Sequence, residues 1–157
     1  MQNKFYKDER SKVISYHDKK MAIINMQTMR YINLLDRASN VKTKKCFVYN
    51  NTIYFAVPAS LISKAIGPAA SNIRRMQENL GKRIRIIPEP EGIMDAEKFV
   101  ANIVDPVKFK SLEMKDGMFV LNASSQSKAA LIGRNRRRLD ELKQIMQDLF
   151  NLDLKII

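Results

Sequence analysis

Apolar and polar positions follow two different periods along this chain, and these periods predict its helices and strands. Over residues 24–38 apolar side chains recur at steps of four and three, which predicts an amphipathic helix. Residues 44–57 carry β-branched and aromatic runs on either side of Asn50 and Asn51, a pair that tolerates positive φ, so this segment predicts a two-residue β-hairpin. The next elements expected are a short helix at 60–66, a second helix between Gly67 and Gly81, and a strand at 83–87.

The same order of elements recurs in the second half of the chain. The turn residues Asp116 and Gly117 lie 66 positions after Asn50 and Asn51, and Gly133 lies 66 positions after Gly67. A fixed internal period indicates a duplicated structural unit. The second copy predicts a helix at 95–104, strands at 107–114 and 118–122, a short helix at 126–132, a long helix containing 139–149, and a strand at 153–157.

A stretch rich in proline and glycine, 88–92, separates the two copies. Two prolines and a glycine so close together interrupt any regular element, and a short stiff connection should hold the copies in a nearly fixed orientation. Residues 1–20 are polar and charged, so we expect an extension that is flexible unless a partner orders it, or else a short helix. The predicted organisation is an extension at 1–20, a first domain at 21–88, a linker at 89–94 and a second domain at 95–157.

Charge is distributed unevenly along the chain. The formal net charge of +12 divides into +3 for residues 1–20, +9 for 21–88 and zero for 89–157. A basic surface of this kind is typical of proteins that bind nucleic acid or another polyanion. The neutral last segment nevertheless places four arginines within 134–138. Four guanidinium groups so close together repel one another unless an anion lies nearby, which favours a polyanionic partner for this loop.

Each copy contains a loop that suits a phosphate group. The loop begins at a glycine after a short helix and leads into the N-terminus of a longer, arginine-rich helix, where unpaired backbone N–H groups and a partial positive charge attract phosphate oxygens. Glycine lets a nucleic-acid backbone approach closely. The candidate nucleic-acid-binding residues are Ile66, Gly67, Pro68, Ala69, Ala70, Asn72, Arg74 and Arg75 in the first copy, and Ile132, Gly133, Arg134, Asn135, Arg136, Arg137 and Arg138 in the second.

This layout resembles the archaeal NusA-like transcription factors, which consist of two type II KH domains. The resemblance rests on the order of the elements, on 65–67 followed by 71–73, on 80–83, and on 131–135. It implies an α+β fold of two tandem type II KH domains, each a three-stranded sheet packed by three helices. It also implies a non-enzymatic protein that binds single-stranded or structured RNA, namely nascent transcript or ribosomal RNA, in transcription elongation or termination, with RNA polymerase or the ribosome as a further partner.

Both loops depart from the family pattern G-x-x-G. The fourth loop position holds Ala70 in the first copy and Arg136 in the second, and the first loop holds Pro68 and Ala69 where a basic residue is common. Arg136 can either block the phosphate path or bond to the phosphate itself. The departures leave a second hypothesis open, in which the domains are scaffolds that bind RNA polymerase or the ribosome mainly through protein or structured RNA.

Plainer interpretations compete with several of these assignments. Arg74 and Arg75 can form the solvated face of a helix, and the strand aromatics at 47, 49, 55, 109 and 119 suit core packing better than base stacking. A single histidine, His17, and a single cysteine, Cys46, give no catalytic or metal-binding pattern, so we expect no enzyme activity and no cofactor. No long apolar run is present, and one cysteine cannot form an internal disulfide, which favours a soluble, cytoplasmic protein without a membrane partner.

Overall fold

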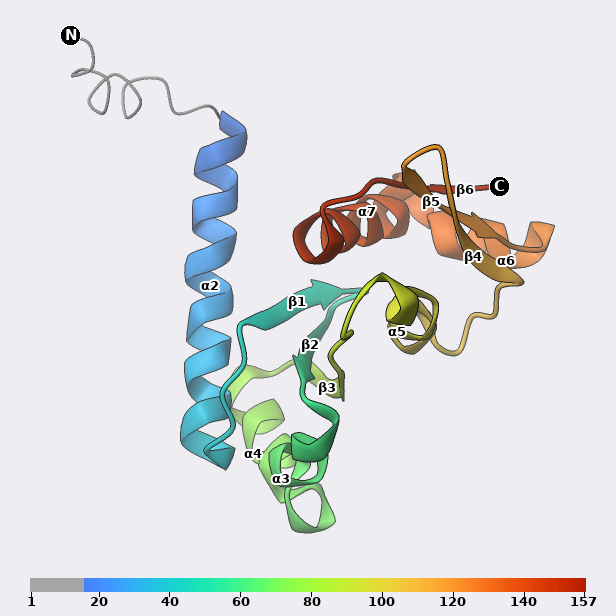
Figure 1. Ribbon diagram of the computed structural model, residues 1–157. Coiled ribbons are helices and arrows are strands. Elements are labelled where there is room, and N and C mark those ends of the chain that lie inside the picture. The colour runs from blue at the N-terminus through green and yellow to red at the C-terminus, as the bar shows by residue number, and fades with distance from the viewer. Residues whose placement is uncertain (1–15) are drawn as a thin grey trace, which may run out of the picture.

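The computed structural model describes the backbone of residues 16–157 and the side chains of residues 26–157 (Figure 1). The described chain forms two three-stranded sheets with helices around them, which confirms the expected α+β fold of two tandem KH domains. The first unit contains α2 (Tyr16–Ser39), β1 (Lys45–Tyr49), β2 (Thr52–Val57), α3 (Ile62–Ile66), α4 (Ser71–Leu80) and β3 (Arg83–Pro88). The second contains α5 (Ala96–Val104), β4 (Ser111–Lys115), β5 (Met118–Asn122), α6 (Ser125–Ile132), α7 (Arg137–Phe150) and β6 (Leu154–Ile156).

Both sheets have the same mixed topology. In the first, β1 and β2 form an antiparallel hairpin, and β3 adds in parallel to β2 with Ile53 opposite Ile84. In the second, β4 and β5 form the hairpin, and β6 adds in parallel to β5 with Phe119 opposite Leu154. The predicted turns are confirmed, because Asn50 has φ 50° and Asn51 has φ 62°, as a two-residue hairpin loop requires.

Several element bounds differ from those expected. Helix α2 begins at Tyr16, so residues 16–20 of the expected extension are helical, and residues 1–15 lie outside the described part of the chain. Strand β4 begins at Ser111 and not at 107, because the chain after α5 first reverses direction: the N–H of Val107 donates to the carbonyl of Val104 at 2.9 Å. Residues 93–95 of the expected linker form a 3-10 turn that leads into α5.

The first unit packs its own helices against one face of its sheet. Every residue of β2 is buried, and alternate side chains of this strand point to opposite faces. Ile53, Phe55 and Val57 face α2, α3 and α4 and share one hydrophobic cluster with Leu35 and Met76. A strand that is apolar on both faces must be covered on both sides.

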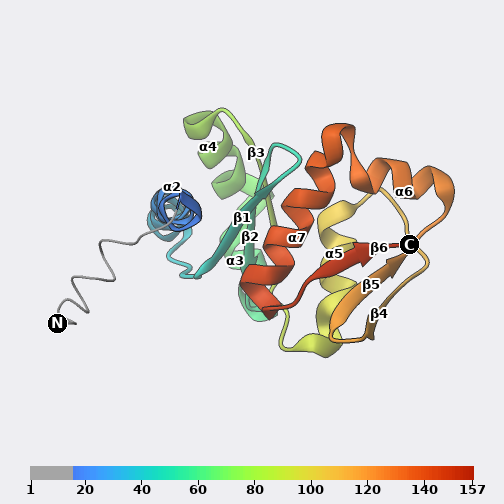
Figure 2. The same ribbon diagram turned by 90° about the horizontal axis from the view of Figure 1, so that it is seen from above.

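The second unit covers the other face of that sheet (Figures 1 and 2). Phe47 stacks on Tyr54 with ring centroids 5.4 Å apart and meets Phe99 of α5 edge to face at 5.9 Å. The hydroxyl of Tyr54 donates to the carbonyl of Ile103 at 2.8 Å, which satisfies a buried polar group at the junction. The two units therefore share a hydrophobic core, and their orientation is set by this packing as well as by the connecting segment.

On the corresponding face of the second sheet, strand β4 is polar. The residues 66 positions after Phe47 and Tyr49 are Glu113 and Lys115, and both are exposed. An aromatic surface in the first copy and a charged surface in the second fit a molecule in which only the first sheet has a partner domain on its outer face.

Candidate nucleic-acid interface

The two loops adopt one backbone conformation although their sequences differ. Gly67 has φ 83° and ψ 164°, and Gly133 has φ 75° and ψ 173°. The third and fourth loop residues then lie in the left-handed region, with φ 52° and 59° in the first loop and 55° and 62° in the second. These four residues are Ala69, Ala70, Asn135 and Arg136. The loop geometry of the fold is therefore kept in both copies.

Glycine is required at the first loop position by space as well as by φ. A Cβ atom on Gly67 would lie 2.9 Å from the side chains of Ser71 and Asn72, and a Cβ on Gly133 would lie 2.5 Å from Cγ of Arg138. Non-bonded carbon atoms are normally at least 3.5 Å apart, so neither position accepts a side chain without movement of its neighbours. The bend that brings the two helices together depends on these two glycines.

The fourth loop position explains both the family's glycine and the cost of replacing it. A left-handed φ costs a residue with a Cβ roughly 1–2 kcal/mol, while glycine adopts it freely. Ala70 and Arg136 therefore hold an unfavourable backbone conformation. The third position differs between the copies, because asparagine tolerates this region better than alanine. The first loop consequently carries the larger conformational cost.

Polar groups near the first loop are directed toward its own backbone. The buried amide of Asn72 donates to the carbonyl of Lys64 at 3.2 Å and thus ties α4 to the end of α3, and Nη2 of Arg75 donates to the Asn72 amide oxygen at 3.4 Å. Arg74 donates to the carbonyl of Ala69. Pro68 has no N–H at the second loop position. The first loop therefore offers a phosphate fewer donors than the second.

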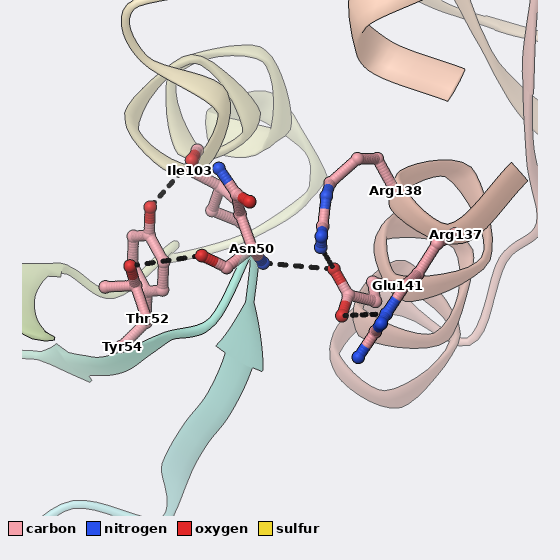
Figure 3. Close-up of polar contacts among 7 residues, drawn as sticks. All are labelled: Asn50, Thr52, Tyr54, Ile103, Arg137, Arg138 and Glu141. Carbon is pink, nitrogen blue, oxygen red and sulfur yellow. Dashed lines mark hydrogen bonds and ion pairs between the residues drawn. The ribbon is translucent and has the colours of Figure 1, made fainter. Parts of the chain in front are cut away.

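The four arginines of the second loop divide into two pairs. Arg134 and Arg136 are exposed, and no carboxylate lies within ion-pair distance of either among residues 26–157. Arg137 and Arg138 instead contact Glu141, with 3.9 Å between Nε of Arg137 and the carboxylate (Figure 3). The charges that a polyanion can neutralise without breaking an existing pair are thus those of Arg134 and Arg136.

Glu141 also links the second loop to the first unit. Its Oε1 accepts a hydrogen bond of 3.0 Å from the backbone N–H of Asn50, at the tip of the first hairpin (Figure 3). The guanidinium of Arg138 lies 5.9 Å from the ring centroid of Tyr49, within the range of a cation–π contact. Burial raises the pKa of Tyr49 to about 12, and the Arg138 charge opposes that rise. Arg138 therefore belongs to the junction between the units.

A groove of about 430 Å³ runs beside the second loop. Its apolar residues come from α6, α7 and β6, and its cations come from the loop, α7 and β6. The residues that form it are Ile132, Arg136, Leu139, Lys143, Leu154, Lys155 and Ile156. An apolar floor with cations along the rim can hold bases inside and phosphates at the edge. The side chains of Lys143 and Lys155 were not among the sequence-predicted candidates, because only the fold brings them beside Arg136.

Other chemistry has few components in the described part of the chain. Residues 26–157 hold no group of three His, Cys, Asp or Glu side chains placed to bind a metal ion. Burial raises the pKa of the Cys46 thiol to about 12, so it stays protonated at neutral pH, which agrees with the expected packing role. The aromatics at 47, 49, 55 and 119 lie in strands and pack in the two cores, as expected. Phe109 lies before β4 and not in a strand, but it also packs, partly buried, against the second core. None of the helices in the described chain is long and apolar enough to cross a bilayer.

Comparisons with known proteins agree with this geometry. The family model "KH domain" matches residues 52–101, which include β2, α3, α4 and β3. The chain is 23% identical over 128 residues to a protein of Halococcus morrhuae named "Probable transcription termination protein NusA", a match that covers 80% of this chain and 90% of that protein. A protein of Methanocaldococcus jannaschii with the same name is 22% identical over 120 residues, covering 74% of this chain and 64% of that protein.

Among solved structures, the "Crystal structure of APE1850" matches with a TM-score of 0.58 and 25% identity, over 82% of this chain and 96% of that one. The structural match therefore extends over both units, whereas the family model covers the first unit from β2 onward and ends within α5. Taken with the paired sheets and the two glycine-anchored loops, these findings show a KH domain match in the first unit, a second unit of the same topology, and a chain similar to the archaeal proteins named NusA.

Proposed function

We propose that this protein binds single-stranded RNA through its second unit, with the phosphates held at the 133–136 loop and the bases in the adjacent groove. The observation that carries this proposal is the pair of exposed arginines, Arg134 and Arg136, which have no carboxylate partner among residues 26–157. Of the two, Arg136 also lines the apolar groove beside the loop. An arginine forms short, charge-assisted hydrogen bonds to phosphate, and the desolvation of bases in the groove adds to the affinity.

The first unit has a different role in this proposal. Its loop lacks a donor at Pro68, and the nearby Arg74 and Asn72 are bonded to loop and helix carbonyls. Its segment 21–88 nevertheless carries a net charge of +9. Such a surface supplies affinity for RNA that does not depend on a tight clamp. The first unit would therefore act as an electrostatic platform beside the second.

The names of the two archaeal relatives point to the process in which this binding would take place. Both are called transcription termination proteins. By this similarity we propose that the RNA is a nascent transcript and that the protein acts in elongation or termination beside RNA polymerase. The competing proposal is a KH scaffold that binds RNA polymerase or the ribosome through protein or structured ribosomal RNA, and the degenerate first loop favours it for the first unit.

Titration of fluorescent single-stranded RNA, followed by anisotropy, tests the proposed function. The variant Arg134→Ala/Arg136→Ala removes the unpaired arginines, and Lys110→Ala/Lys115→Ala removes the same charge from exposed positions beside and on β4. We expect the arginine variant to lose about tenfold or more in affinity, and the lysine variant to lose clearly less, because each charge-assisted contact contributes about 1.5–3 kcal/mol. Equal losses in the two variants would contradict a clamp at the second loop, and no binding by the wild type would favour the scaffold.

A further inference from the structure

A second recess lies on the other side of the 133–136 loop, between the two units. It has a volume of about 560 Å³, in the range of pockets that hold small molecules or a nucleotide. The first unit contributes the hairpin tip and the start of β3, with Arg83 and Arg85, and the second contributes Asp105, Gly133 and Arg138. Gly133 lines this recess, and its neighbours Ile132 and Arg136 line the groove described above. The recess and the groove therefore adjoin at the 133–136 loop.

The recess has more positive charge than its own carboxylates balance. Arg138 is paired with Glu141, as described above. Arg83 and Arg85 have no carboxylate within ion-pair distance among residues 26–157, and Asp105 is the acid that lines the recess with them. Unpaired like charges that converge on a partly enclosed space favour the binding of an anion there.

The two arginines are held differently. The guanidinium of Arg85 lies 5.7 Å from the ring centroid of Tyr54, whose own hydroxyl is fixed to the Ile103 carbonyl (Figure 3). This contact orients the planar group across the junction, which reduces the entropy lost when it binds a ligand. Arg83 is exposed at the start of β3. One arginine is therefore oriented by the protein, and the other can reach toward a ligand.

We propose that this recess, the interdomain recess, binds the backbone phosphates of the same RNA strand beyond the segment held at the second loop, with Arg83 and Arg85 as the phosphate contacts. The inference rests on the proposed function and extends it, because it assigns the first unit a defined contact in place of diffuse attraction. Tyr49 and Tyr54 are buried, so their rings are closed to stacking by bases, and the recess recognises the RNA backbone. The site consequently requires both units in their packed orientation.

RNA probes of two lengths distinguish phosphate binding at the interdomain recess from phosphate binding at the 133–136 loop. The probes are oligouridines of four nucleotides, the length that a KH loop holds, and of about eight nucleotides, which extends past it. The variants are Arg83→Ala/Arg85→Ala, the loop variant Arg134→Ala/Arg136→Ala, and Lys110→Ala/Lys115→Ala as the charge-matched control. Anisotropy gives the affinities, and circular dichroism checks that each variant is folded.

We expect Arg83→Ala/Arg85→Ala to bind the longer RNA about tenfold more weakly than wild type and to bind the four-nucleotide RNA within about twofold of wild type, because two phosphate contacts are lost only where the strand reaches them. The loop variant should weaken both RNAs. If Arg83→Ala/Arg85→Ala loses the contact between Arg85 and Tyr54 and fails to fold, Arg83→Glu, at an exposed position, gives the same test.

Two results would overturn the inference and leave the proposed function intact: unchanged binding of the longer RNA, or an equal loss for both lengths. A ten-residue glutamate peptide that binds wild type more tightly than the longer RNA, and that depends on Arg83, would assign the recess to an acidic protein segment. Failure of wild type to bind either RNA would overturn the proposed function itself, and the recess with it.

Discussion

Replacing Ala70, at the strained fourth position of the first loop, by glycine should stabilise the protein. Alanine-to-glycine replacements usually have the opposite effect and lower the free energy of unfolding. Ala70 has φ 59° and ψ 30°, a left-handed conformation that costs an alanine roughly 1–2 kcal/mol. Ala70→Gly removes this cost. The added freedom of glycine in the unfolded chain offsets roughly 0.4–1 kcal/mol of the gain. The variant should therefore be more stable than wild type by about 0.5–1 kcal/mol, which raises the midpoint of thermal unfolding by about 2 °C.

The matched control is Ala101→Gly, at an exposed position in α5, where the backbone is a right-handed helix. Glycine there should lower the free energy of unfolding by about 0.5–1 kcal/mol, because helical alanine is unstrained. Urea unfolding followed by circular dichroism measures both variants under one set of conditions. If Ala70→Gly destabilises the protein as much as Ala101→Gly does, the reasoning about the left-handed loop is refuted.

Three further predictions concern the junction, the partly buried thiol of Cys46 and the second loop. Glu141→Gln should lower the free energy of unfolding by about 1 kcal/mol, because the charge opposite the half-buried Arg138 is lost; unchanged urea unfolding would contradict this role. The pKa of Cys46 rises from 9.0 to about 12 in the fold, so ionisation favours the unfolded chain and stability should fall as pH rises from about 9 to 12. Cys46→Ala should flatten that decline, and rapid alkylation of the native thiol at pH 8 would argue against its burial. Gly133→Ala should distort the loop, so the loss in free energy of RNA binding should exceed the loss in free energy of unfolding. Wild-type affinity in this variant would show that RNA binding does not depend on the loop conformation.

The sequence predicted the repeated architecture because its signals are local. Asn50 and Asn51 favour positive φ, as do Asp116 and Gly117, and the apolar periods on either side of these turns distinguish strand from helix. Gly67 likewise marks its loop, since its φ and its neighbours exclude a side chain. Local propensity could not fix the start of β4, where a turn after α5 takes residues that would otherwise suit a strand.

The junction between the units was the main feature that the sequence analysis missed. The aromatic residues Phe47 and Tyr49 were assigned to packing, but a single strand pattern does not tell which layer lies against them. Comparing the two copies at the 66-residue offset would have indicated the junction. Phe47 and Tyr49 correspond to Glu113 and Lys115 in the second copy, whose sheet has no other unit packed on that face.

The sequence predicted where the two candidate loops lie, but not which partners their charged side chains have. Both loops lie where the repeat placed them, and both keep the same backbone. The partners of the charged side chains could not be read from the sequence, because they depend on contacts across the fold: Arg138 meets Glu141 and Tyr49, whereas Arg134 and Arg136 meet no carboxylate among residues 26–157. Arg83 and Arg85 were not among the candidate binding residues: both were expected in a strand, and Arg83 also ended the 80–83 segment of the family resemblance.

The salt dependence of RNA affinity tests the central claim most directly. Binding of a single-stranded RNA is measured at several salt concentrations for wild type and for Arg134→Ala/Arg136→Ala, and the logarithm of the affinity is plotted against the logarithm of the salt concentration. Each phosphate neutralised on a single strand contributes about −0.7 to the slope, so loss of two contacts should make the slope shallower by about 1.4. A slope that is the same in both proteins would contradict phosphate binding by these two arginines.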